Sequence, residues 1–303
     1  MSAAWEGLVT VANGVRLRAR WDGPEDAPAV LLVNGLMMAI EAWQGLSDRL
    51  LPGHRVLRYD TRGQGGSDDP PGPHTIERHA HDLTTLLDAL EPGPLHVVGL
   101  SSGAPIALLA CAERARTAPG SLRSMTVCDG FLALDAHLGW VVRAWLAAHE
   151  AGGPGVRFDI ATPWVWGQAF LAEHADGVAA WRAAALAGDA TRAHHLIAGM
   201  AAFDGDAGPA LDALACPVLA LVGEDDVMTP PRHARAIAER SADGRMASVA
   251  RAGHAAPIER PDAVAEALLA FWREVATSAA SAPEPTAPEP TAPSGATRKE
   301  PDA

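Results

Sequence analysis

Short apolar runs with β-type residues alternate with longer helical patterns along most of the chain. Apolar residues recur at helical spacing from residue 76 to 90 and again from 264 to 272. Alternation of this kind predicts a mostly parallel sheet flanked by helices, because each parallel strand needs a crossover connection. The buried strands are predicted at residues 30–33, 56–59, 95–98, 124–128, 218–222 and 247–250.

A hairpin is predicted at the N-terminus, ahead of these strands. Residues 8–11 and 15–20 flank Asn13-Gly14, a pair that favours the tight turn between two antiparallel strands. Together with the six buried strands, the hairpin predicts an eight-stranded sheet.

One interval, residues 132–214, breaks the alternation, because it contains helical patterns and no convincing strand. It follows the sixth predicted strand and carries five of the nine tryptophans. We therefore predict an α/β core formed by residues 1–131 and 215–278, with residues 132–214 inserted as a helical cap. Five tryptophans exceed what a small helical bundle needs for its own core, so some of them are expected to contact a ligand. The tryptophans assigned to this role are Trp140, Trp145, Trp164 and Trp166.

Residues 279–303 form a proline-rich tandem repeat without any large apolar side chain. Such a segment cannot bury enough surface to offset the entropy of ordering the chain. It is predicted to be a disordered tail with a polyproline II bias.

Composition and charge limit the classes of partner. The 303 residues include 48% hydrophobic residues, and 37 acidic against 24 basic residues give a net charge of −13. Binding to nucleic acid requires a basic surface, so nucleic acid is not an expected partner. The N-terminus lacks a secretory pattern, no apolar stretch reaches the roughly 18 residues of a membrane span, and three widely spaced cysteines suit buried free thiols. We expect a cytoplasmic protein without membrane contact, and the sequence leaves its oligomeric state open.

A candidate nucleophile, Ser101, stands in Gly99-Leu100-Ser101-Ser102-Gly103, between the strand at 95–98 and an apolar helix. This strand, elbow and helix arrangement exposes a serine hydroxyl at the carboxyl end of a sheet. Gly99 and Gly103 provide the room that so sharp a turn requires. A serine in this setting is typical of nucleophilic catalysis.

A serine nucleophile needs a base, and the base needs an acid that orients it. Asp226 follows the strand at 218–222, and His254 follows the last predicted strand, so both reach the same sheet edge as Ser101. Glu224 and Asp225 adjoin Asp226. Asp129, which follows the strand at 124–128, is the alternative acid.

Residues 5–275 resemble the α/β-hydrolase superfamily, and residues 55–78 are especially similar to 3-oxoadipate enol-lactonases and related esterases. The resemblance implies the α/β-hydrolase fold, with the cap inserted after the sixth strand, and it assigns the nucleophile to Ser101, the base to His254 and the acid to Asp226. It also implies that the glycine-rich turn from Asp60 through Arg62, Gly63 and Gly65 to Ser67 is scaffold.

The oxyanion hole of this family implies backbone N–H donors at Ser102 and Leu36. The sequence departs from the family there, because Asn34-Gly35 stands where relatives have His-Gly. The Leu36 donor should survive the change, since every non-proline residue carries a backbone N–H.

The expected reaction is hydrolysis of a small carboxylic ester or lactone through an acyl-enzyme, without a cofactor or metal. Relatives with an aspartate nucleophile, the haloalkane dehalogenases and epoxide hydrolases, are excluded by Ser101. An acyltransferase or a cofactor-free haloperoxidase with the same triad stays open, as does a ligand receptor that kept the fold.

The cap leaves the substrate class open. Four arginines could anchor a carboxylate, whereas the tryptophans favour an apolar or aromatic ester. His79-Ala-His81-Asp82 resembles part of a metal motif but lies within a helical pattern, and His194-His195 is expected on a half-exposed helix surface. The four arginines are Arg143, Arg157, Arg182 and Arg192.

Overall fold

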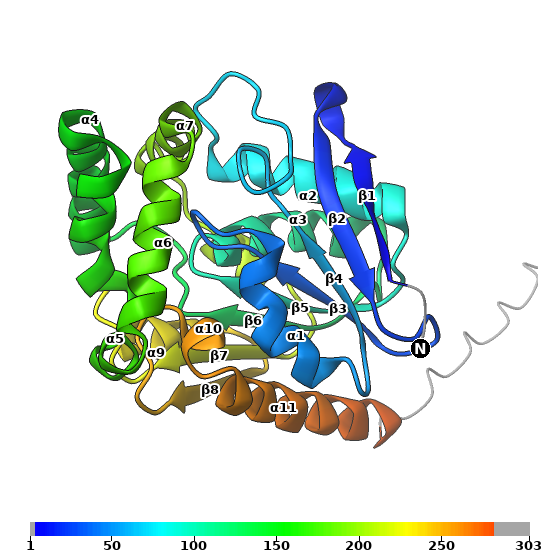
Figure 1. Ribbon diagram of the computed structural model, residues 1–303. Coiled ribbons are helices and arrows are strands. Elements are labelled where there is room, and N and C mark those ends of the chain that lie inside the picture. The colour runs from blue at the N-terminus through cyan, green and yellow to red at the C-terminus, as the bar shows by residue number, and fades with distance from the viewer. Residues whose placement is uncertain (1–3, 282–303) are drawn as a thin grey trace, which may run out of the picture.

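Eight strands form a single sheet in the computed structural model, which describes residues 4–281 (Figure 1). The strands are β1 (Trp5–Thr10), β2 (Arg16–Asp22), β3 (Ala29–Val33), β4 (Arg55–Tyr59), β5 (Leu95–Leu100), β6 (Leu122–Cys128), β7 (Val218–Gly223) and β8 (Gly244–Val249). Their spatial order is β1-β2-β4-β3-β5-β6-β7-β8. β2 pairs antiparallel with β1 and with β4, and the other pairs are parallel. The mostly parallel eight-stranded sheet is thus confirmed.

Helices cover both faces of this sheet. One apolar core packs α2, α3, α8 and α9 against the sheet, and a second core packs α1, α10 and α11 against the opposite face. The central strands are buried on both faces, which explains their continuous apolar sequence. These helices are α1 (Gln44–Leu50), α2 (Ile76–Leu90), α3 (Gly103–Thr117), α8 (Gly208–Asp212), α9 (Pro231–Arg240), α10 (Ala256–Glu259) and α11 (Pro261–Ser281).

Four helices between β6 and β7 form the helical cap, a name kept here for residues 136–201. They lie together beyond the carboxyl ends of the parallel strands (Figure 1). The predicted insertion, 132–214, is wider than this cap, because Leu211 of α8 is buried in the core below. The cap helices are α4 (Ala136–Val165), α5 (Gln168–Glu173), α6 (Ala175–Ala187) and α7 (Ala190–Ala201).

α4 is broken at Gly153, whose φ of 72° is in the left-handed region. Pro154 follows at once, and proline cannot donate the backbone hydrogen bond that would continue the first helical segment. The break lets the two halves of α4 run in different directions along the cap. Within residues 4–281, no helix is long and apolar enough to cross a membrane.

α11 continues to Ser281, three residues into the segment that the sequence assigned to the tail. The correction has a local cause, since Ala279 and Ala280 are strong helix formers and the first proline of the repeat is Pro283. The rest of the predicted tail, residues 282–303, lies outside the described residues.

Candidate active site

Ser101 occupies the sharp turn between β5 and α3. Its φ of 54° is unusual for a residue with a side chain. The turn requires glycine on both sides: a Cβ atom on Gly103 would lie 2.4 Å from the carbonyl oxygen of Val33, and one on Gly99 would lie 2.6 Å from that of Gly103. The predicted elbow geometry is therefore present, with the hydroxyl of Ser101 held at the carboxyl end of the sheet.

Three side chains from separate loops meet at this edge. Oγ of Ser101 lies 2.7 Å from Nε2 of His254, and Nδ1 of His254 lies 2.9 Å from Oδ2 of Asp226. Asp226 is held in turn by Thr229, whose hydroxyl donates to Oδ2 at 2.7 Å and whose backbone N–H donates to Oδ1 at 2.9 Å. The structure thus brings together the three residues that the sequence assigned to a triad.

Burial and charge shift the pKa values of His254 and Asp226 in opposite directions. Burial alone would lower the pKa of His254, but the neighbouring carboxylate of Asp226 outweighs that effect and raises it. Burial would raise the pKa of Asp226, yet the positive charge and hydrogen bond of His254 lower it. Asp226 therefore stabilises the protonated form of His254, which is the form that a general base reaches when it takes a proton.

The alternative acid, Asp129, serves the backbone instead. Its Oδ1 accepts from the N–H of Gly223 at 2.8 Å, and its Oδ2 accepts from the N–H of Ala256 at 3.0 Å. Burial, together with the negative charge of Asp226, raises the pKa of Asp129 well above its usual range. Asp129 thus joins β7 to Ala256, just after His254, and among the described residues no hydrogen bond joins its carboxylate to the imidazole.

Glu259 is a site residue that the sequence analysis missed. Its buried carboxylate accepts hydrogen bonds from the N–H groups of Gly253 at 3.0 Å and of Gly167 at 3.2 Å. The backbone N–H of His254 itself donates to the carbonyl of Val165 at 2.9 Å. The loop that carries the imidazole is therefore bound to the end of α4 and the start of α5. A carboxylate on the helix after His254 gave no recognisable signal in the sequence.

The loop after β3 lies beside the nucleophile. A Cβ atom on Gly35 would come within 3.4 Å of Cβ of Ser101. Among the hydrogen bonds of residues 4–281, neither the N–H of Leu36 nor that of Ser102 is a donor, so both are free for a ligand. This is the arrangement expected of the two predicted oxyanion donors.

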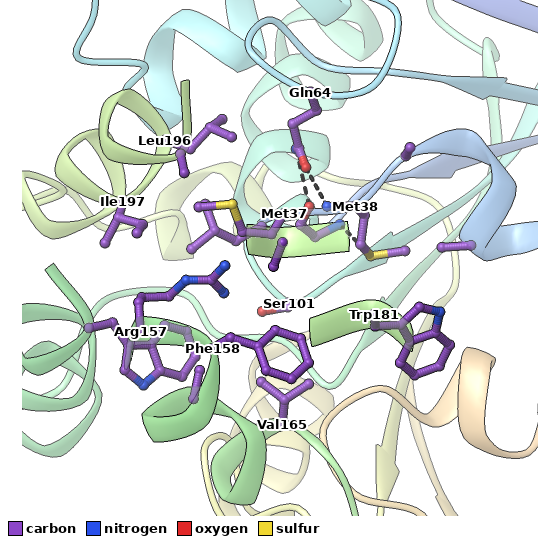
Figure 2. Close-up of a pocket in the computed structure, with 18 of the residues that line it drawn as sticks. Met37, Met38, Gln64, Ser101, Arg157, Phe158, Val165, Trp181, Leu196 and Ile197 are labelled. Carbon is purple, nitrogen blue, oxygen red and sulfur yellow. Dashed lines mark hydrogen bonds between the residues drawn. The ribbon is translucent and has the colours of Figure 1, made fainter. Parts of the chain in front are cut away.

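Two side chains shape that loop. Gln64 donates to the carbonyl of Gly35 at 3.2 Å and accepts from the N–H of Met38 at 2.5 Å (Figure 2). Oδ1 of Asn34 accepts a 2.7 Å hydrogen bond from Nε1 of Trp43. Asn34 thus points into the scaffold, and Gln64, unrecognised in the sequence, fixes the loop from the other side.

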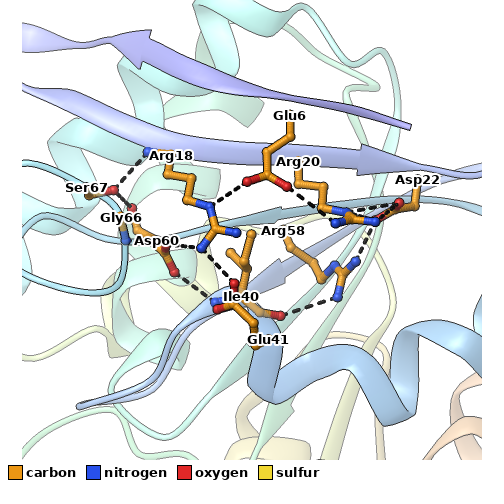
Figure 3. Close-up of polar contacts among 10 residues, drawn as sticks. All are labelled: Glu6, Arg18, Arg20, Asp22, Ile40, Glu41, Arg58, Asp60, Gly66 and Ser67. Carbon is orange, nitrogen blue, oxygen red and sulfur yellow. Dashed lines mark hydrogen bonds and ion pairs between the residues drawn. The ribbon is translucent and has the colours of Figure 1, made fainter. Parts of the chain in front are cut away.

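The glycine-rich turn also holds the loop after β3 in place. Oδ1 of Asp60 accepts from the N–H of Ile40 at 2.8 Å, and Oδ2 accepts from the N–H of Gly66 at 2.8 Å (Figure 3). The hydroxyl of Ser67 donates to the carbonyl of Asp60 at 2.6 Å. The turn that carries Gln64 is therefore tied to the loop that carries the candidate oxyanion donors, which is a scaffold role.

A cavity of about 850 Å³ extends from Ser101 and His254 into the cap. Two of the four tryptophans assigned to ligand contact, Trp145 and Trp166, line it. Trp181 lines it as well (Figure 2). The other two assignments, Trp140 and Trp164, are wrong for this cavity. They flank a separate, shallow hollow of the cap, and Trp140 is 70% exposed. Residues 140 and 145 are five apart on one helix, about 140° around its axis, so Trp145 borders both hollows whereas Trp140 borders only the shallow one.

The cap arginines divide in the same way. Arg157 and Arg192 line the cavity, whereas Arg143 and Arg182 do not. Arg143 stacks over the ring of Trp140, with 4.7 Å from Cζ to the ring centroid, and Arg182 forms an ion pair of 2.6 Å with Asp159.

The remaining histidine candidates have structural contacts. His79 is buried in α2, and its burial lowers its pKa to about 3. His195 on α7 and His74 on the loop before α2 both contact Oδ1 of Asp69, at 3.4 and 2.7 Å. This group, which joins the cap to the core, is the one set within residues 4–281 whose ligand atoms lie within 4.8 Å of one another, as metal ligands do.

Residues 30–267 match the family described as “Alpha/beta hydrolase family”. The relative “Putative carbamate hydrolase RutD” of Variovorax paradoxus is 32% identical over 259 residues, which cover 84% of this chain and 94% of the relative. The “3-oxoadipate enol-lactonase 1” of Acinetobacter baylyi is 34% identical over 154 residues, or 50% of this chain and 55% of the relative. The resemblance inferred from the residues is confirmed.

A solved structure is similar to this chain in its three-dimensional fold. A thermophilic esterase from Thermogutta terrifontis, determined with malate bound, has a TM-score of 0.77 and 27% identity to this chain. The match covers 89% of this chain and 99% of that one.

Proposed function

Since this chain is a hydrolase that belongs to the alpha/beta hydrolase family, we propose that it cleaves a carboxylic ester or lactone of a small organic molecule through a serine acyl-enzyme. One observation carries the proposal: the hydrogen-bonded series from Asp226 through His254 to Ser101 ends in a cavity. In this proposal Ser101 is the nucleophile, His254 is the general base and Asp226 orients His254.

The first step is attack of Oγ of Ser101 on the carbonyl carbon. His254 takes the hydroxyl proton at Nε2, and the ionised carboxylate of Asp226 stabilises the imidazolium at Nδ1. The carbonyl oxygen becomes an oxyanion between the N–H groups of Leu36 and Ser102. Each such donor is worth roughly 3–4 kcal/mol of transition-state stabilisation.

Collapse of the tetrahedral intermediate then breaks the ester bond. His254 returns its proton to the leaving alcohol, and the acyl group stays on Ser101. A water molecule, activated by the same imidazole, attacks the acyl-enzyme and releases the acid. The chain's own side chains and backbone supply every group in this sequence, so the proposal includes no cofactor.

The substrate is proposed to be small, because 850 Å³ lies in the range of cavities that enclose a single drug-sized ligand. Relatives and neighbours named as an enol-lactonase and an esterase support a lactone or ester carbonyl.

Carbamate hydrolysis is the second candidate. It is favoured by the relative named as a carbamate hydrolase, which matches 84% of this chain. The same triad would form a carbamoyl-enzyme instead of an acyl-enzyme, so the two functions differ in the group next to the carbonyl. A panel that pairs each carboxylic ester with its carbamate analogue separates them by the ratio of kcat/KM values.

The test of the proposal is Ser101→Ala in the full chain. We expect loss of ester hydrolysis and of labelling by a fluorophosphonate probe, with an unchanged circular dichroism spectrum and melting temperature. Hydrolysis that persists in this variant contradicts the proposal.

Two rivals are tested in the same assay. Added alcohol or peroxide would divert the acyl group of an acyltransferase or a haloperoxidase. A receptor would retain its ligand without turnover.

A further inference from the structure

Three side chains direct one polar atom each to a common point where the cap meets the core. Oδ1 of Asp69 lies 2.7 Å from Nε2 of His74 and 3.4 Å from Nδ1 of His195. All three atoms lie within 4.8 Å of one another. The two imidazole rings are inclined at 74°, with their centroids 5.3 Å apart, so they meet at an edge instead of stacking. Two imidazole nitrogens and one carboxylate oxygen therefore converge.

The spacing of these atoms suits a metal ion better than a set of hydrogen bonds. The 3.4 Å between Asp69 and His195 exceeds the roughly 2.7–3.2 Å of an ordinary N–H···O hydrogen bond. Neighbouring ligand atoms in a tetrahedral zinc site lie about 3.4 Å apart, because zinc–ligand bonds are about 2.1 Å long. Nε2 of His74 is closer to Oδ1 than this, so the carboxylate of Asp69, which is 15% exposed, must move slightly when an ion enters.

Backbone contacts already hold the two segments together. The N–H of His74 donates to the carbonyl of His195 at 3.0 Å, and α7 lies beside the loop before α2 (Figure 1). A Cβ atom on Gly199 would lie 1.9 Å from the carbonyl oxygen of His74, and one on Gly72 would lie 2.5 Å from the ring of His195. Glycine at both positions lets the helix approach the loop this closely. The three side chains are thus positioned before any ion binds, which reduces the entropy lost on binding.

The cluster can be reached from solvent and is separate from the catalytic groups. The side chain of His74 is fully buried, whereas those of Asp69 and His195 are 15% and 23% exposed. An ion can therefore enter from the side of Asp69 and His195 and keep a water molecule as its fourth ligand, as three-ligand zinc sites do. The lining of the cavity at Ser101, within residues 4–281, includes none of the three.

We propose that Asp69, His74 and His195 bind a zinc ion that joins the cap to the core. Zinc accepts imidazole nitrogen together with carboxylate oxygen in tetrahedral sites, whereas Ca²⁺ and Mg²⁺ prefer oxygen ligands alone. The loop before α2 supplies two ligands, and α7 supplies the third, 126 residues from Asp69 in the sequence. The ion takes no part in the hydrolysis proposed above. It holds α7, whose Leu196 lines the cavity, against the core.

The proposal is tested by zinc binding to the full chain after dialysis against a chelator. Isothermal titration calorimetry and competition with a chromogenic chelator should give a single zinc ion per chain. Loss of a hydrogen-bond partner behind a metal ligand costs about 10- to 100-fold in affinity, so loss of a ligand itself in His195→Gln should cost at least about 100-fold. His195 is partly exposed, which favours a folded variant. Asp69→Asn is the second variant, and circular dichroism checks the fold of both.

The matched control is His194→Gln. This variant removes the neighbouring imidazole of the same helix, which contacts Glu150 at 3.2 Å and lies outside the cluster, so zinc affinity should not change. Co²⁺ provides a spectroscopic readout, because a tetrahedral site gives it visible absorption. The absorption should appear in wild type, His194→Gln and Ser101→Ala and should be absent from His195→Gln. Zinc should also slow amide hydrogen exchange in α7 and in residues 69–74, compared with α9.

Two results overturn the proposal. Zinc that binds equally well to wild type and His195→Gln, and is lost in His254→Gln, occupies the triad instead. Wild type that binds no zinc at micromolar concentration shows that the three side chains form only a hydrogen-bonded contact between cap and core. Neither result bears on the triad's role in hydrolysis, which Ser101→Ala tests separately.

Discussion

Oε2 of Glu259 accepts a hydrogen bond of 3.2 Å from the backbone N–H of Gly167, at the junction between α4 and α5. The same oxygen accepts from the N–H of Gly253, next to His254. A Cβ atom on Gly167 would lie 2.8 Å from the nitrogen of Gly253, so the two backbones are in direct contact there. The position of the imidazole therefore depends on the cap as well as on the sheet.

Glu259→Gln should slow catalysis without changing substrate affinity. The amide presents an N–H₂ group toward one of the backbone donors, so the loop that carries His254 must shift. A displacement of about 1 Å in a catalytic group costs on the order of 10²-fold in rate. We expect kcat and the rate of fluorophosphonate labelling to fall together by tenfold or more, with KM nearly constant. Glu266→Gln, on the exposed face of α11, is the matched control; a lower melting temperature without slower labelling would restrict Glu259 to a structural role.

Asp226→Asn should reduce turnover far more than Asp129→Asn. Asparagine at 226 no longer holds the N–H tautomer of His254, a change that in a serine protease costs about 10⁴ in kcat. Asp129 contacts the backbone N–H groups of Gly223 and Ala256, so its substitution should act mainly on stability. Turnover is compared in variants shown to be folded. If Asp129→Asn were the more damaging, Asp129 would be the triad acid.

The pH dependence of kcat/KM should report His254. Because Asp226 raises the pKa of His254 above its usual value of about 6.5, and because the base must be neutral, activity should rise with pH to a plateau whose midpoint lies above that value. Asp226→Asn removes the main charge that opposes the effect of burial, so the midpoint of the residual activity should move to lower pH. A midpoint that stays in place contradicts this coupling.

The pKa shifts of His254 and Asp226 should also make the free energy of unfolding depend on pH. A raised pKa of His254 in the folded protein contributes stability that is present at acidic pH and is lost as pH rises through that pKa. The lowered pKa of Asp226 contributes stability that is lost as pH falls through it. The difference in free energy of unfolding between wild type and Asp226→Asn should therefore be largest between about pH 4 and about pH 6.5, the usual pKa values of the two side chains, and smaller on both sides. Urea titrations across this range measure it.

Asn34→Ala should destabilise the fold by about 1–3 kcal/mol, because it leaves the buried indole N–H of Trp43 without an acceptor. The double variant Asn34→Ala with Trp43→Phe removes both partners, so no donor is left unpaired. Its loss of stability should therefore be smaller than the sum of the losses in the two single variants. Urea unfolding of the four proteins gives the coupling energy. A coupling near zero would show that the hydrogen bond does not support this loop.

Local sequence patterns were sufficient to predict the buried strands and the candidate triad residues. Continuous apolar runs predicted the buried strands because a strand covered on both faces must be apolar along its length. The elbow around Ser101 was predictable because only glycine tolerates the contacts of 2.4 and 2.6 Å that a Cβ atom would make at Gly103 and Gly99. Asp226 and His254 were candidates because each follows a parallel strand, and such strands end at one edge.

Tertiary structure decided what the residue types left open. Asp129 and Asp226 both follow strands, and only the loops around them direct one carboxylate to Nδ1 of His254 and the other to backbone N–H groups. Trp140 and Trp145 belong to one helix, and its rotation decides which of them faces the cavity.

Contacts between distant segments determine the roles of the residues that the sequence analysis missed. Gln64 and Glu259 act on backbone groups 29 and 92 residues away in the sequence, so no local pattern could identify them. Arg157 resembles the other cap arginines in sequence, and only the packing of the cap decides that it lines the cavity while Arg143 stacks on Trp140 and Arg182 pairs with Asp159. Helical periodicity and strand order are properties of neighbouring residues, whereas the partner of a charge or hydrogen-bond donor depends on how distant segments pack.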